Sequence, residues 1–104
     1  MNINVLTPDK EIFYGEILSV KVPGMMGQFQ ILKNHAPVVS SLTSGQVEIQ
    51  TVKGEHRMYN DESGNVETVA DPGRKFSFDI ERGFIEVLNN EINLLVEGVQ
   101  SIAS

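Results

Sequence analysis

Apolar and polar residues alternate along most of this chain, which is the pattern of a β-strand with one buried face. The clearest example follows Gly45, where Val47 and Ile49 share one face and the intervening residues are polar. No long segment repeats apolar residues every three to four positions, as an amphipathic helix does. Val99 and Ile102 have the spacing of one helical turn at the end of the sequence. The pattern therefore predicts an all-β chain, with strands that include residues 3–5, 17–22, 47–51, 76–80, 84–88 and 91–97.

Glycine, proline and asparagine separate the expected strands at short intervals. Pro8 fits the second position of a type I turn, and Pro23-Gly24 fits a tight turn. Asn89-Asn90 suits the positive backbone angles of a two-residue hairpin loop. Short strands joined in this way are typical of two sheets packed face to face. We predict a two-sheet β-sandwich, or flattened barrel, whose interior is filled by Phe13, Phe29, Phe76, Phe78 and Phe84.

The segment from Lys53 to Arg74 is dense in charge and poor in apolar residues. Its apolar residues fall into two short groups, Met58-Tyr59 and Val66 with Val69. These groups suit the two arms of a hairpin whose tip is residues 62–65. We predict a single domain over residues 1–104, with an extended, mobile hairpin or loop around residues 53–75.

Composition excludes several classes of partner. The chain has 104 residues, no cysteine and a formal net charge of −6. Nucleic-acid binding needs clustered lysine and arginine, so this balance argues against a nucleic-acid partner. The first residues do not resemble a signal peptide, and no run approaches the roughly 18 apolar residues of a membrane span. We therefore expect a soluble chain that does not insert into a membrane.

Few residues suit catalysis or metal binding. His35 precedes Ser40-Ser41, but nothing resembles the strained turn of a nucleophilic serine, so a structural or contact role is favoured. Glu55-His56 with Asp61-Glu62 offers ligand atoms without the paired histidines of zinc sites, and His56 is expected in a solvated, charged hairpin. A phosphate-binding loop is also absent. The sequence predicts no catalytic residue, no metal and no cofactor.

The segment 22–37 combines turn residues with candidates for a partner contact. Gly24 and Gly27 permit backbone angles that a side chain resists, and Met25 and Met26 lie between them. Soft, adaptable methionines on an exposed loop suit a contact surface. The run Pro23-Gly24-x-x-Gly27-x-Phe29-x-Ile31-Leu32-x-Asn34-His35-Ala36-Pro37 resembles the signature of the epsilon subunit of F-type rotary ATP synthases. Blocks within 7–16, 42–49 and 83–90 resemble the same family in the same order.

The resemblance implies the fold and role of that subunit's N-terminal domain. The fold would be a β-sandwich of about ten strands. The chain would be a non-catalytic subunit of the central stalk, which is the rotor of a proton-translocating ATP synthase at the cytoplasmic face of the bacterial inner membrane. One side would pack on the gamma subunit. The loop matching Gly24, Met25, Met26, Gly27 and Gln28, with His35 in the segment beside it, would contact the c-ring.

Three departures from the family pattern change these expectations. Arg82 stands where the family usually has a second glycine before Gly83-Phe84, and the segment 53–74 is longer than the usual hairpin. After Gly98 too few residues remain for the C-terminal helical hairpin of many members. We therefore expect neither ATP binding nor inhibition by inserted helices. The alternative function is a free-standing β-sandwich that binds a small ligand or carbohydrate, although the only large polar aromatic residues are Tyr14 and Tyr59.

Overall fold

The computed structural model describes residues 1–60 and 63–103, and this part of the chain contains eleven β-strands. The strands follow the expected alternation; in β8, for example, Phe76, Phe78 and Ile80 are buried and the intervening side chains are not. The all-β prediction is therefore confirmed. The strands are β1 (Asn2–Leu6), β2 (Glu11–Gly24), β3 (Gly27–Leu32), β4 (Val38–Leu42), β5 (Gly45–Thr51), β6 (Gly54–Asn60), β7 (Asn65–Asp71), β8 (Lys75–Ile80), β9 (Arg82–Leu88), β10 (Glu91–Glu97) and β11 (Gln100–Ala103).

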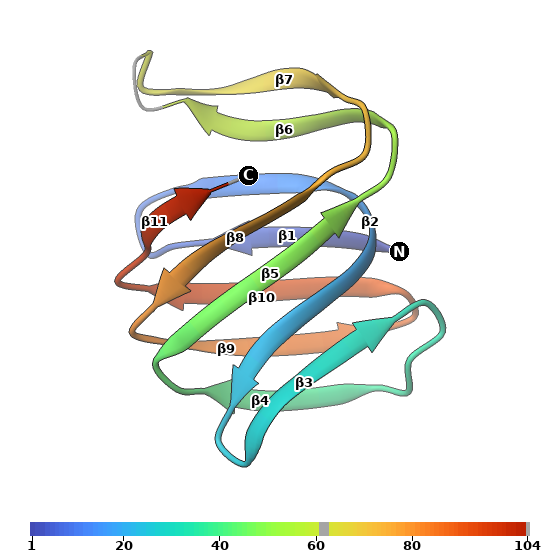
Figure 1. Cartoon of the computed structure of the whole chain (residues 1–104), viewed down its shortest axis with the longest axis vertical. Helices are drawn as coiled ribbons and strands as arrows, with labels where there is room; N and C mark the ends of the chain where they lie inside the picture. The colour runs from blue at the N-terminus through green and yellow to red at the C-terminus, as the bar shows by residue number, and fades with distance from the viewer. Residues whose placement is uncertain (61–62, 104) are drawn as a thin grey trace.

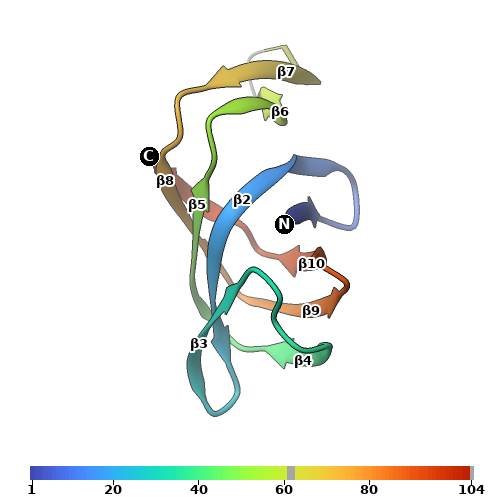
Figure 2. The same ribbon diagram turned by 90° about the vertical axis from the view of Figure 1, so that its right-hand side faces the viewer.

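The strands form two layers that face each other across the core (Figure 1, Figure 2). The back layer contains β1, β10, β9 and β4 in spatial order, and the front layer contains β3, β2, β5, β8 and β11. β2 also pairs with β1, and its last residue pairs with β4, so the sheet closes on itself. The predicted β-sandwich, or flattened barrel, is confirmed.

β2 is shared by both layers and is 14 residues long. Its first half pairs with β1 and β6, and its second half pairs with β3 and β5. The register with β5 shifts between Ile17 and Ser19, which marks a bulge. Strict alternation places Leu18 on the face of Val20, but the bulge leaves Leu18 53% exposed while Ile17 and Val20 are buried.

The core contains branched aliphatic side chains and three phenylalanines, Phe13, Phe76 and Phe78. Phe29 is only partly buried against this core. Phe84 is 39% exposed, so its predicted place in the interior is wrong. The reason is the pleat of β9, in which the inward positions belong to Ile85 and Val87 and their neighbours point to solvent.

The residues spaced like a helical turn, Val99 and Ile102, are not helical. Gln100–Ala103 form β11, which pairs antiparallel with β8. β8 pairs with β5 on its other side, so β11 supplies backbone hydrogen-bond partners to what would otherwise be an open sheet edge. This pairing favours extended backbone over a short, isolated helical turn.

β6 and β7 form a hairpin that departs from the sandwich between β5 and β8 (Figure 1). β5 and β8 pair directly with each other, so the hairpin is an excursion from an otherwise continuous pair. It joins the sheet through two residue pairs with β2, Phe13 with Met58 and Tyr14 with Arg57. Glu62, which belongs to the predicted tip at 62–65, lies outside the described residues.

The root of this hairpin is buried. His56 is 3% exposed, its ring centroid lies 5.4 Å from that of Phe13, and its Nε2 lies 3.0 Å from the carbonyl oxygen of Val52. The expected solvated position of His56 is therefore wrong, because this residue takes an inward position of β6. Asp61 and Glu62, which were considered with it as metal ligands, lie outside the described residues. Elsewhere in the described chain, no three histidine, aspartate or glutamate side chains could together hold a metal ion.

Candidate functional site: two partner-contact surfaces

The hairpin of β2 and β3 ends in a loop that carries two exposed methionines. Gly24 and Gly27 form the last residue pair, and Met25 and Met26 lie between them with side chains 72% and 101% exposed. Gln28 is exposed beside them. Residues 24–28, called the tip below, lie at the lower end of the molecule in Figure 1. Exposed, adaptable apolar side chains at a protruding loop are suited to contact another protein.

Two glycines shape the tip. Gly27 has a φ of 119°, a conformation that strongly favours glycine. A Cβ added at Gly24 would lie 2.7 Å from Cε1 of Phe29, so the missing side chain lets that ring pack beneath the loop. Phe29 in turn contacts the core. The tip is therefore shaped by its own backbone and anchored by one aromatic ring.

Replacing Gly27 with valine is expected to strain the tip and leave the sandwich folded. A β-branched residue at this positive φ costs about 1–3 kcal/mol. No atom lies within 4 Å of the added Cβ position, so no steric clash reaches the core. Circular dichroism during heating should show one cooperative transition at a lower temperature, while affinity for a partner bound at the tip falls. Loss of the cooperative transition would instead show that the loop belongs to the core.

His35 is not part of the tip surface. It lies in the loop after β3, whereas the tip precedes β3, and the six residues of β3 span roughly 20 Å at about 3.3 Å per residue. The loop is held in place because the backbone N–H of Asn34 donates to Oδ1 of Asn90 at 2.6 Å. His35 is exposed, with its Nδ1 2.7 Å from the carbonyl oxygen of Ala36. The structure therefore brings Gly24 to Gln28 together and places His35 apart from them.

A second candidate surface, which the sequence pattern does not reveal, lies on the outer face of the back layer. Leu6, Leu95 and Phe84 are in register on three adjacent strands, and we call them the apolar row. Together with Pro8 they line an open hollow of about 430 Å³. Leu95 and Phe84 are 44% and 39% exposed. The one sequence signal is Leu95, an apolar residue on the otherwise polar side of its strand.

A charged rim borders the apolar row. Nη1 of Arg82 donates to Oε2 of Glu97 at 2.7 Å, and Glu81 lies 4.0 Å from the same guanidinium. The hydrogen bond to Glu97, with the charges of both carboxylates, raises the pKa of Arg82 above its ordinary value, so the guanidinium stays protonated. An apolar centre with a polar rim is the usual composition of a protein–protein interface. Arg82, at a position where the family pattern has glycine, contributes a cross-strand ion pair with Glu97 to this rim.

Neither histidine is placed for catalysis. The ring of His35 lies at hydrogen-bond distance from the adjacent backbone carbonyl of Ala36. Nε2 of His56 lies 3.0 Å from the carbonyl oxygen of Val52 and 3.7 Å from Oδ2 of Asp71. In the described part of the chain, neither ring is hydrogen-bonded to a serine, and Oγ of Ser40 donates instead to the carbonyl oxygen of Ser41. Within residues 1–60 and 63–103, the arrangement offers no nucleophile paired with a base. What the geometry does offer is two exposed apolar surfaces on a packed sandwich.

Comparison with known proteins assigns the chain to a family. The sequence profile described as "ATP synthase, Delta/Epsilon chain, beta-sandwich domain" matches residues 1–71. The chain belongs to this family. A relative from Chlorobium limicola, named ATP synthase epsilon chain, is 38% identical over 97 residues, which cover 93% of this chain and 89% of the relative. The epsilon chain of Leptospira borgpetersenii is 35% identical over 97 residues, but the match spans 61% of that relative.

Solved structures share the fold of this family member. A chain in the structure of the Tetrahymena thermophila mitochondrial ATP synthase central stalk and c-ring matches 97% of this chain with a TM-score of 0.66 and 17% identity. A chain of the Euglena gracilis mitochondrial ATP synthase matches 94% with a TM-score of 0.68 and 17% identity. These matches cover 66% and 51% of the respective structures' chains. Among the described residues, no helix is long and apolar enough to cross a membrane.

Proposed function

We propose that this chain is the epsilon subunit of a rotary ATP synthase, located in the central stalk between the gamma subunit and the c-ring. The observation that carries the proposal is its membership of the epsilon family, with 38% identity to the Chlorobium limicola epsilon chain over nearly the full length of both. This membership favours a rotor subunit over a free-standing ligand-binding sandwich. The chain would act by contact and not by catalysis, as part of a complex at the cytoplasmic face of the bacterial inner membrane.

The two surfaces suit two different neighbours. We assign the tip to the c-ring, because Met25 and Met26 protrude at one end of the longest dimension of the molecule, which is 37 Å. We assign the apolar row of the back layer to the gamma subunit, because a broad, half-exposed apolar surface with a polar rim suits a lasting subunit interface. His35 remains a separate predicted contact, which the assignment of the tip does not require.

The mechanical role follows from the packing. A sandwich transmits torque between two partners only if its two surfaces keep a fixed relative position. β2 runs through both layers and ends at the tip, while its partner β1 carries Leu6 of the apolar row. Closely packed interiors deform little under load. A force applied at the tip is therefore passed through continuous backbone to the gamma-facing layer.

A binding experiment tests the proposed function. The chain is mixed with the purified gamma subunit of the same genome and passed over a size-exclusion column. We expect a stable complex with one copy of each protein. Absence of a complex, with both proteins shown to be folded by circular dichroism, would contradict the assignment as a stalk subunit and leave only the shared fold.

A further inference from the structure

β3 borders the front layer of the sandwich, and one of its two edges is open. Its six residues pair with the end of β2, from Ser19 to Gly24. Within the part of the chain that the structure describes, no other strand pairs with β3, which lies at the lower right of the front layer in Figure 1. On a strand that is paired on one side only, every second residue directs its backbone N–H and C=O groups to the open side. β3 therefore presents a row of backbone donors and acceptors that fits a further strand.

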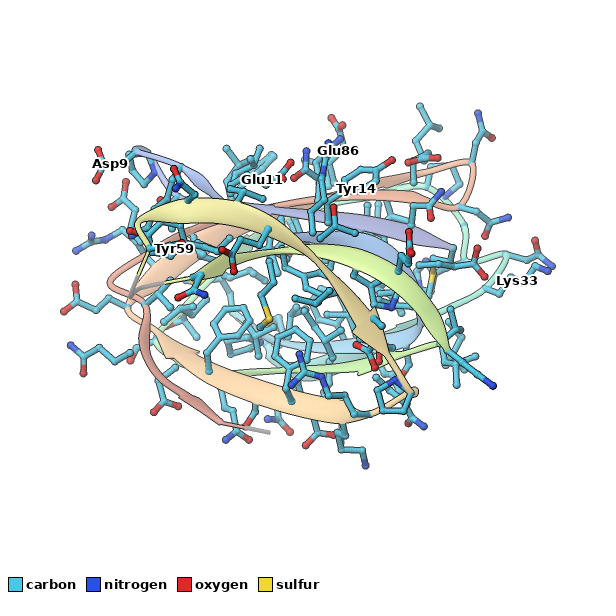
Figure 3. All side chains as sticks on the ribbon, turned by 90° about the horizontal axis from the view of Figure 1, so that it is seen from above. Asp9, Glu11, Tyr14, Lys33, Tyr59 and Glu86 are labelled. Atoms are coloured by element: carbon cyan, nitrogen blue, oxygen red, sulfur yellow. The ribbon has the colours of Figure 1, made fainter. Side chains whose placement is uncertain are left out.

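The open edge of β3 lacks the features that commonly prevent pairing between sheet edges. These features are charged side chains, proline and short strand length. β3 contains neither a charged residue nor a proline. The nearest charge along the chain is Lys33, which Figure 3 shows projecting to solvent at the border of the molecule. The edge is thus open to a strand of another molecule.

The other strands with an open edge in residues 1–60 and 63–103 each carry one of these features. β7 contains the charged residue Glu67. β11 has only four residues. β4 directly follows Pro37, and its last residue, Leu42, pairs with Gly24 of β2. β3 is therefore the edge best suited to intermolecular pairing.

The side chains of β3 match those of a second β3 that runs in the opposite direction. In an antiparallel pair centred on Phe29, Gln28 of one copy lies opposite Gln30 of the other. Both are exposed, and each amide can donate and accept a hydrogen bond. At each end of the pair, Met26 of one copy lies next to Leu32 of the other; their side chains are 101% and 53% exposed. Amides thus meet amides and apolar side chains meet apolar ones, with no charges between them.

β3 is held in position before any such pairing. Ile31 is fully buried, and Phe29 packs against the core. The loop that follows β3 is tied to the back layer through the hydrogen bond from the N–H of Asn34 to Oδ1 of Asn90. A strand that is already ordered loses little conformational freedom when it binds, which favours association.

We propose that two copies of this chain associate through β3, which forms an antiparallel pair with β3 of the second copy about a twofold axis near Phe29. A self-complementary contact of this kind is the usual arrangement of a homodimer. The pairing joins the two front layers into one continuous sheet. Lys21 lies beside Gln30 on β2, and the two copies of Lys21 are separated by both β3 strands, roughly 14 Å or more. The inference concerns the free chain and does not depend on the proposed function.

Sedimentation equilibrium of the full chain measures this association. The contact is small, so we expect a dissociation constant on the order of 0.1 mM. Each copy has a formal net charge of −6, so raising the salt concentration should strengthen the wild-type dimer by screening the repulsion between copies.

Charge substitutions on β3 locate the contact. One variant carries Gln28→Lys with Gln30→Lys, and a second carries Gln28→Glu with Gln30→Glu. Each places like charges opposite each other in the dimer, so we expect each alone to associate about tenfold more weakly than the wild type, or less. An equal mixture of the two variants should associate again, because opposite charges then face each other across the pair.

The matched control carries Val66→Lys with Thr68→Lys, which adds the same charge to the open edge of β7. We expect it to associate as the wild type does. A wild-type chain that stays monomeric at about 1 mM overturns the inference. Association that the β3 variants leave unchanged, or an equal loss of association in the control, also overturns it. Failure of the mixture to associate, with both variants shown to be folded by circular dichroism, does the same.

Discussion

Replacing Phe78 with alanine is expected to lower the free energy of unfolding by about 3–5 kcal/mol. Phe78 is 1% exposed, lies directly opposite Val47 on β5, and packs with its ring centroid 6.4 Å from that of Phe76. Removing the ring leaves a cavity that surrounding β-strands fill poorly. A domain of this size has a total stability of about 5–15 kcal/mol. Urea unfolding followed by circular dichroism measures the change.

Leu18→Ala is the control for this experiment. Leu18 is 53% exposed and lies at the bulge in β2, so its truncation should change the free energy of unfolding by less than about 0.5 kcal/mol. A loss below 1 kcal/mol for Phe78→Ala, at an unchanged dependence on urea, would contradict the packing of the front layer described above.

Replacing Leu95 with glutamate is expected to weaken binding of the gamma subunit by about 2–4 kcal/mol, roughly 30- to 1000-fold. The new carboxylate would lie at the centre of the apolar row, between Leu6 and Phe84, and would lose its water in the complex, which is costly for a charged group. Surface plasmon resonance against immobilised gamma subunit measures the change, which we expect mainly in the dissociation rate.

Leu18→Glu is the matched control for the binding experiment. It introduces the same charge at a leucine of the front layer whose exposure, 53%, is close to the 44% of Leu95. We expect wild-type affinity for this variant. Equal loss of affinity in both variants would show that added negative charge alone weakens the complex. Normal binding by Leu95→Glu would contradict the assignment of the apolar row to the gamma subunit.

The strand content of the fold follows directly from the sequence. In β5 and β8, apolar and polar residues alternate without interruption, and in β10 only Leu95 breaks the alternation; each of these strands has one buried face as predicted. Alternation gives the period of a strand but not its register, so a single bulge places Leu18 in solvent. It also cannot tell which side of β9 faces inward when both sides are apolar, and Phe84 is wrongly placed for this reason.

The candidate site was only partly predictable. Met25 and Met26 are exposed as expected, because a loop of two residues between paired glycines offers no core to pack against. The apolar row joins residues from three strands that are up to 89 positions apart in sequence, and no local pattern can bring them together. The burial of His56 depends on the absence of a side chain at Gly15. This contact also joins residues on different strands, so no local sequence pattern could predict it.

The parallel pairing of β1 with β10 has a consequence for the order in which the chain folds during synthesis. β1 is made before β10, and its paired residues in β10 lie 89 positions further along the chain. The barrel therefore cannot close until β10 has been made, and until then Ile3 and Val5 lack one of their two neighbouring strands. Such long-range pairing slows folding. We expect nascent chains that end before residue 91 to remain sensitive to proteases and dependent on chaperones.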